Sequence, residues 1–188
     1  MRLTHLVLTA STVALLSACA STPRSTTATP PMPGMATTST VQRASVALAS
    51  ASGSLASGAL TAMPMGTGVH FTGEIGGLKP GGSHAIHVHA KGDCSAADAS
   101  SAGDHFNPAM RAHGKVGSGA HHGGDMDNIV ADSRGVAKVS VHADGIVLGG
   151  GAANDALGKA VIVHASADDY TTQPSGNAGG RIACGVIR

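Results

Sequence analysis

Most histidines of this chain are concentrated in one stretch, residues 84–125. The stretch holds seven of the eleven histidines, together with many Gly, Ala and Ser residues and few large apolar side chains. Such a composition offers little apolar surface to bury, whereas imidazole is the commonest metal ligand in proteins. The stretch therefore predicts a ligand-bearing segment that a core built elsewhere in the chain must support.

The rest of the chain has the composition of a β protein with tight turns. Its 188 residues include 27 glycines, no tryptophan, one tyrosine and two phenylalanines, and this length suits one domain plus extended ends. Short runs with strand patterns lie between glycine-rich turns, at residues 45–48, 55–61, 68–75, 135–141, 146–148 and 160–163. We therefore expect an all-β fold of short antiparallel strands.

The N-terminal 18 residues have the pattern of an export signal. A basic start precedes an apolar run, residues 6–16, that is too short to cross a bilayer as a stable helix. The run ends in LSAC, which resembles the bacterial lipobox, in which the cysteine is lipidated; an ordinary signal peptide is the alternative. We predict an exported lipoprotein of the periplasm or cell envelope, held by lipid on Cys19, with the outer membrane favoured by Ala20.

A tether is predicted after the lipid site. Residues 19–42 are almost wholly Ser, Thr, Ala, Pro, Gly and Met, and they cannot bury enough surface to offset the entropy cost of ordering. The folded domain is then expected over residues 43–188. Thioether sulfur suits Cu(I), but we interpret the methionines of the tether and the first strands as adaptable apolar side chains, at Met32, Met35, Met63 and Met65.

Two histidines alternate along one predicted strand. Between Ala85 and His89, the residues Ile86 and Val88 face one way, so His87 and His89 emerge together on the other face. Two imidazoles on one face can hold one ion, although such a pair also occurs by chance. The formal net charge of +1, with no basic run, gives no reason to expect a nucleic-acid partner.

Further potential ligands follow in loop-like sequence. His105, His113 and His122 are separated by Gly and Pro residues, and Asp125 lies three residues after His122. Three histidines and an aspartate can fill a tetrahedral zinc site, whereas an all-imidazole set suits copper. The alternative is a histidine-rich, solvated loop.

Two segments make the chain similar to a known family. Residues 85–95, AIHVHAKGDCS, and residues 176–187, GNAGGRIACGVI, resemble the two signatures of Cu,Zn superoxide dismutases. HFNP, HG and HxGD elements lie between them at family-like spacing, and the resemblance covers residues 45–188. It implies an eight-stranded Greek-key β-barrel, an immunoglobulin-like sandwich, with long metal-binding and C-terminal loops.

The resemblance also implies a site with one copper and one zinc per subunit. It assigns copper to His87, His89, His105 and His164, and zinc to His105, His113, His122 and Asp125. His105 would bridge both metals and supply a proton, Arg181 would guide the anionic substrate, and Asp168 would orient a copper ligand and a zinc ligand from outside.

Cysteines, charges and the remaining histidines complete the sequence predictions. Cys94 and Cys184 remain once Cys19 is assigned to lipid, and in an exported protein such a pair predicts a disulfide. Residues 170–175 are uncharged, so steering of an anion falls to Arg181, the copper and Lys91 or Lys159. The resemblance gives His84 a structural role, whereas three other histidines are expected to be solvated, namely His70, His121 and, in a turn, His142.

The predicted function is disproportionation of superoxide to dioxygen and hydrogen peroxide, which would protect the cell envelope. The chain would act as a monomer or homodimer and touch a membrane only through lipid on Cys19. The main alternative is a non-enzymatic periplasmic copper or zinc carrier on the same fold. A purely structural envelope lipoprotein is a weaker alternative, because it would not need seven ligands at this spacing.

Overall fold

The structure is a computed structural model that describes residues 34–188. The predicted signal peptide, the lipid site at Cys19 and most of the tether lie outside the described residues. The described part contains nine strands and one short 3₁₀ helix: β1 Ala44–Ser50, β2 Ser57–Met65, β3 Gly68–Gly76, β4 Ser83–His84, β5 Ile86–His89, η1 Ser100–Ala102, β6 Ile129–Val130, β7 Ala137–Asp144, β8 Ala160–His164 and β9 Arg181–Val186. No helix within residues 34–188 is long and apolar enough to cross a membrane.

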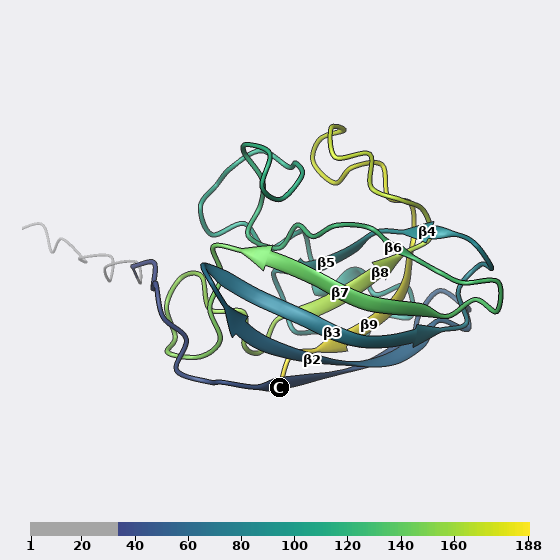
Figure 1. Cartoon of the computed structure of the whole chain (residues 1–188), viewed down its shortest axis with the longest axis horizontal. Coiled ribbons are helices and arrows are strands. Elements are labelled where there is room, and N and C mark those ends of the chain that lie inside the picture. The colour runs from purple at the N-terminus through teal and green to yellow at the C-terminus, as the bar shows by residue number, and fades with distance from the viewer. Residues whose placement is uncertain (1–33) are drawn as a thin grey trace, which may run out of the picture. The chain divides into compact units, whose positions relative to one another are not determined.

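Seven strands form one antiparallel sheet in the order β5-β8-β9-β1-β2-β3-β7, and β4 pairs with β6 in a second, two-stranded sheet. Ala85 alone separates β4 from β5, so the two form one interrupted strand and the fold has eight strands on that count. The chain turns between β6 and β7, where Asp132 N–H donates to Val136 O over 2.8 Å. β6 lies beside β7, one edge of the large sheet, and pairs with β4, which leads into β5 at the other edge (Figure 1). The predicted all-β, Greek-key barrel is confirmed.

Alternation along the strands decides which side chains form the core. In β3 and β7 the apolar residues are buried and the residues between them stand on the outer face of the sheet. Phe71 and Ile75, for example, are fully buried. His142 lies in β7 and not in a turn, so that prediction is wrong; the β7 ladder continues to Asp144, and the His142 side chain is half-buried.

The predicted tether is wrong for residues 36–41, which are fixed to the domain. Ala36 N–H donates to Asn154 Oδ1 over 2.8 Å, and Asn154 Nδ2 donates back to Ala36 O over 2.9 Å. The N–H groups of Thr40 and Val41 donate to Leu148 O, both over 2.9 Å. The polar composition of the segment gave no sign of these contacts. They are made by backbone groups and by the Asn154 side chain, which the composition does not mark.

The predicted strand at residues 146–148 is also wrong. These residues are buried, but apart from one isolated bridge between Val147 and Asp155 they form a loop. Three glycines with positive φ, at residues 149–151, follow directly and turn the chain away. The apolar run therefore reflects core filling without strand pairing.

Two long loops meet on one side of the barrel. One joins β5 to β6 and spans residues 90–128; the other joins β8 to β9 and spans residues 165–180 (Figure 1). They are connected where His113 N–H donates to Gln173 Oε1 and Gln173 Nε2 donates to His113 O, each over 2.9 Å. This loop pair covers the outer face of β5, where the predicted ligands begin.

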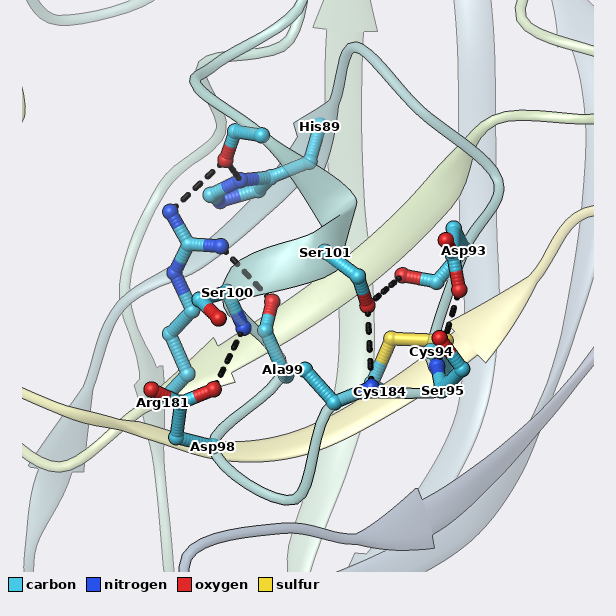
Figure 2. Close-up of a disulfide and its surroundings, with 12 residues drawn as sticks. His89, Asp93, Cys94, Ser95, Asp98, Ala99, Ser100, Ser101, Arg181 and Cys184 are labelled. Carbon is cyan, nitrogen blue, oxygen red and sulfur yellow. Dashed lines mark hydrogen bonds between the residues drawn. A yellow bond between two sulfur atoms is a disulfide. The ribbon is translucent and has the colours of Figure 1, made fainter.

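The predicted disulfide is present and ties the first loop to β9. Cys94 and Cys184 form a disulfide, with 5.8 Å between their Cα atoms (Figure 2). The two cysteines are separated by 90 positions in the sequence. Ser101 Oγ donates to Asp93 O over 2.9 Å and accepts from Ala96 N–H over 3.1 Å, which folds the segment after Cys94 back on itself. The disulfide thus anchors a compact segment beside β9.

Replacing both cysteines, Cys94→Ser with Cys184→Ser, should lower the free energy of unfolding of the metal-free protein by about 4 kcal/mol, because the cross-link limits the unfolded chain. Denaturant titration measures the change. Wild type with its disulfide reduced is the control and should match the variant. An unchanged transition midpoint would contradict the expected contribution.

Candidate metal centre

The strand β5 is buried on both faces, for two different reasons. Ile86 and Val88 pack into the core as the alternation predicts, while His87 and His89 lie beneath the long loops. The exposed fraction of both histidines is at most 1%. A strand that buries two imidazoles away from water must provide partners for their nitrogens, since an unpaired buried polar atom is costly.

The four predicted copper ligands come together. One ring nitrogen from each of four histidines lies within 4.8 Å of the others, namely His87, His89, His105 and His164. β8 runs antiparallel to β5 and ends at His164, whose N–H donates to Ala85 O over 2.9 Å. His89 Nε2 and His164 Nε2 are 3.4 Å apart. Strand pairing therefore brings the distant His164 to the β5 histidines.

The four predicted zinc ligands form a second cluster under the same 4.8 Å limit, and the two clusters share His105. Asp125 is at its centre: its oxygens lie 2.8 Å from His105 Nδ1, 3.0 Å from His113 Nδ1 and 3.3 Å from His122 Nδ1. The carboxylate also accepts from the N–H groups of Gly114 and His122. Its pKa lies well below the usual range, because these hydrogen bonds outweigh the effect of burial.

Hydrogen bonds on the outer side of the rings fix which nitrogens face inward. His89 Nδ1–H donates to Gly103 O over 2.8 Å, and His164 Nδ1–H donates to Gly179 O over 3.2 Å. Asp168 accepts from His87 Nε2–H over 2.8 Å and from His113 Nε2–H over 2.9 Å. Asp168 therefore connects one ring from each cluster, as the resemblance implies, and such outer partners orient metal ligands.

The electrostatics keep most of the copper cluster neutral. Burial lowers the pKa of His89 to about 2, that of His164 to about 3 and that of His105 to about 4. In the unfolded chain the pKa of these histidines is 6.5, so below pH 6.5 the unfolded chain binds more protons than the folded chain. The stability that these groups contribute is therefore lost as pH falls from 6.5 through their folded pKa values. Near pH 7 the three rings have free lone pairs and bind metal without first losing a proton.

His113 behaves in the opposite way. Burial alone would lower its pKa, but hydrogen bonds to Asp125 and Asp168 raise it to about 9. Its stabilising contribution to the metal-free protein is therefore complete below pH 6.5 and is lost as pH rises through 9.

Zinc uptake at pH 7.5 should consequently release about one proton per ion from His113, because a metal bound at Nδ1 displaces the proton there. Calorimetry in two buffers of different ionisation enthalpy counts the protons. His89 and His164, whose pKa values are lowered and which belong to the copper cluster alone, should release none when copper binds, which provides an internal comparison. Zinc uptake without proton release would contradict the raised pKa of His113.

The chemistry of the donor set fits two metal ions. Within residues 34–188, three ring nitrogens of the clusters are buried without a well-aligned hydrogen bond: His87 Nδ1, His105 Nε2 and His113 Nδ1, the last of which lies 3.0 Å from Asp125 Oδ2. His87 and His113 use their other nitrogen on Asp168, and His105 uses its Nδ1 on Asp125. A bound ion would occupy each of these nitrogens, and at His113 it would replace a proton. Four imidazoles suit copper and three imidazoles with a carboxylate suit zinc.

A cleft of about 740 Å³ opens onto the copper cluster. Three histidines of the copper cluster line it, with His122 of the zinc cluster, Lys159 and Arg181, and Asp104 is the one acidic residue among the described residues of its lining. The Arg181 guanidinium donates to Ala99 O and Gly103 O, each over 2.7 Å (Figure 2). Gly103 O thus accepts from both Arg181 and His89, so one carbonyl positions the cation and a cluster ring. Of the two lysines predicted to steer an anion, Lys159 lines this cleft and Lys91 does not.

Two other histidines of the stretch lie outside the clusters. His84 is buried, and its Nδ1–H donates to His164 O over 2.9 Å, which suits the structural role predicted for it. The prediction that His121 is solvated is wrong: only 7% of it is exposed, its Nδ1–H donates to His122 O over 2.8 Å and its Nε2 lies 3.9 Å from Asp144 Oδ2. It fixes the loop end that carries His122.

Sequence reasoning missed two polar residues that support the site. Asn128 accepts from Asp168 N–H and donates to Asp168 O, over 2.8 and 2.9 Å, and Gln173 joins the two loops at His113. Asn128 and Asp168 are 40 positions apart in the sequence, and Gln173 and His113 are 60 apart. No local pattern marks either residue.

Comparison with known proteins identifies the family. Residues 56–187 match the family model described as copper/zinc superoxide dismutase (SODC). A "Superoxide dismutase [Cu-Zn]" of Caulobacter vibrioides is 41% identical over 136 residues, which are 70% of this chain and 78% of that protein. "Superoxide dismutase [Cu-Zn] 2" of Aquifex aeolicus is 42% identical over 115 residues, 60% of this chain and 67% of that protein.

A solved structure agrees with these sequence relatives. The crystal structure of a SOD-like protein from Bacillus subtilis superposes with a TM-score of 0.69 at 34% identity, covering 77% of this chain and 97% of that one. The family model, over residues 56–187, includes the strands and loops that carry both clusters. The chain belongs to the copper/zinc superoxide dismutase family, and it is an oxidoreductase that dismutes superoxide with copper and zinc as cofactors.

Proposed function

We propose that this chain is an exported, lipid-anchored enzyme that removes superoxide at the cell envelope. The apolar run before the LSAC sequence supports export, and Cys19 is the expected lipid site. The other two cysteines form a disulfide, which suits an oxidising compartment outside the cytoplasm. A lipid on Cys19 would hold the enzyme at a membrane without a spanning helix.

The observation that carries the catalytic part is the shared His105. Copper is assigned to the four-histidine cluster and zinc to the cluster around Asp125, and His105 offers Nε2 to the first and Nδ1 to the second. When bound, copper supplies the one-electron redox change that the conversion of two superoxide ions and two protons to dioxygen and hydrogen peroxide requires.

The protein's own residues bind the anion and supply a proton. Arg181 and Lys159 provide positive charge in the cleft, and Arg181 keeps its guanidinium in one orientation through two carbonyl oxygens. His105 lines the same cleft, so a proton on its Nε2 can pass to an anion bound there while its Nδ1 faces the zinc cluster. A carrier protein needs neither a cation in the cleft nor a proton donor, which favours the enzyme over the non-enzymatic alternative.

Replacing Arg181 by Glu should slow dismutation about 10-fold or more at low salt, because it puts a negative charge beside the path of an anion. It should also reverse the salt dependence: wild type slows as salt screens attraction, and the variant speeds up as salt screens repulsion. Rates measured over a range of ionic strength test both effects.

Arg181→Lys is the matched control, because it keeps the charge and loses the two-pronged hydrogen bonding. It should keep the sign of the wild-type salt dependence even where its rate falls. If Arg181→Glu and wild type respond to salt alike, Arg181 has no part in guiding the substrate.

The envelope location is tested by comparing the full chain with Cys19→Ala after expression in a bacterium. Wild type should sediment with membranes and protect cells from superoxide generated in the medium, whereas Cys19→Ala should be absent from the washed membrane fraction. Dismutation by both purified proteins, loaded with copper and zinc, separates anchoring from catalysis. A wild-type protein found in the cytoplasm would refute the location and leave the catalytic assignment untouched.

A further inference from the structure

Three potential ligands for a soft metal stand in a row on the outer face of the sheet, away from both clusters. The strand register sets Met63 of β2 directly opposite His70 of β3, and His70 directly opposite His142 of β7. Because directly opposed residues point to the same face, and the residues on either side of His70 are buried in the core, all three side chains point outward. Opposed Cβ atoms are about 5 Å apart, close enough for side chains to share an ion.

The two imidazoles have the spacing of metal-binding pairs in this protein. The ring centroids of His70 and His142 are 6.2 Å apart with planes at 31°. Ring pairs within the copper cluster range from 4.0 Å, for His87 and His105, to 6.5 Å, for His87 and His89. The separation of the outer pair therefore falls within the range found for the cluster rings.

Their hydrogen bonding is also that of ligands awaiting an ion. His70 Nε2 is 3.1 Å from Ser140 Oγ, which fixes the ring, while His70 Nδ1 is buried and has no partner. His142 Nδ1 is likewise buried without a partner. Among residues 34–188, six buried side-chain atoms lack a partner: three belong to the metal clusters, one to His84 and two to this pair.

The surroundings favour a cation. Asp144 lies two residues after His142 on the same face of β7, where it accepts a hydrogen bond from Thr67 Oγ1 and lies 3.9 Å from His121 Nε2. Its carboxylate adds a negative charge near the pair. Burial lowers the pKa of His142, which favours the neutral form of the ring that can coordinate a metal.

We propose that His70, His142 and Met63 form a third metal site, which binds copper on the outer surface of the barrel. Imidazole alone accepts zinc, nickel or copper, but a thioether beside two imidazoles selects copper, in particular Cu(I). Met63, which the sequence presented as apolar filler, thereby gains a role through two histidines that only the strand register brings to it.

The first test adds Cu(I) to the full chain with both interior sites already filled, in the presence of a weak competing Cu(I) chelator. Wild type should retain about one further copper ion per chain, and the double variant His70→Gln with His142→Gln should retain none. Unchanged contents of the two interior metals show that the variant is folded. The proposal fails if wild type takes up no further copper, or if the double variant takes up as much.

The second test separates this site from general methionine binding. Met63→Leu should weaken Cu(I) binding about 10-fold and leave binding of Zn(II) to the same pair unchanged, since zinc gains little from a thioether. Met65→Leu is the matched control, because Met65 lies on the same face one outward position further along β2 and opposite Gly68. Equal Cu(I) affinity in the two variants would remove Met63 from the site.

Ser140→Ala should lower the affinity of the site for either metal about 10-fold, because the His70 ring is then no longer held in place.

Discussion

Replacing His164 by Ala should abolish dismutation and leave zinc bound. His164 contributes to the copper cluster alone, and it lines the cleft through which an anion reaches that cluster. The zinc cluster lies wholly within residues 105–125 and keeps all four of its members in the variant. Removing a hydrogen-bond partner of a ligand typically costs 10–100-fold in affinity or activity, so removing the ligand should cost more than about 100-fold.

Metal analysis and a superoxide assay on the same preparation measure both effects. The structural hydrogen bond from His84 goes to the backbone oxygen of residue 164, so the variant retains it and the fold at the end of β8. His122→Ala is the complementary control, because His122 contributes only to the second cluster and should affect zinc first. Loss of zinc from His164→Ala, or dismutation at the wild-type rate, would contradict the division of ligands between the two metals.

The sequence predicted the strands that show simple alternation, because there one residue in two is buried. His87 and His89 were placed correctly on one face of β5 for the same reason. Alternation fails where a segment is buried without pairing, as at residues 146–148, and where the ladder continues past the expected turn, as at His142.

Most of the site depends on contacts that no local pattern contains. The division of seven ligands between two metals came from the resemblance, since spacing alone does not indicate that one imidazole belongs to both clusters. His121 was expected to be solvated because nothing in its neighbours indicates that the loop turns its ring toward Asp144. Asn128 and Gln173 act across tens of residues, so only the folded chain brings them to Asp168 and His113.

Gly176 shows how much the outer hydrogen bonds of the site depend on one backbone position. Its φ is +67°, a left-handed conformation that costs other residues roughly 1–2 kcal/mol. A Cβ built there would overlap Asp168 Oδ1 and Cγ and would lie 2.7 Å from His113 Nε2. The missing side chain therefore leaves the space in which the Asp168 carboxylate meets His113.

Gly176→Ala should weaken the binding of both metals together, by about 10–100-fold each, because a displaced Asp168 releases His87 of the copper cluster and His113 of the zinc cluster at once. Competition with chelators for copper and for zinc measures the two affinities separately.

Gly151→Ala is the matched control: Gly151 has nearly the same φ, +70°, but nothing lies within 4 Å of its Cβ position. It should therefore show the cost of backbone strain without any loss of metal. If both variants bind metals alike, Asp168 does not couple the two clusters. If Gly176→Ala loses only zinc, the carboxylate supports His113 alone, and the hydrogen bond to His87 has no part in holding copper.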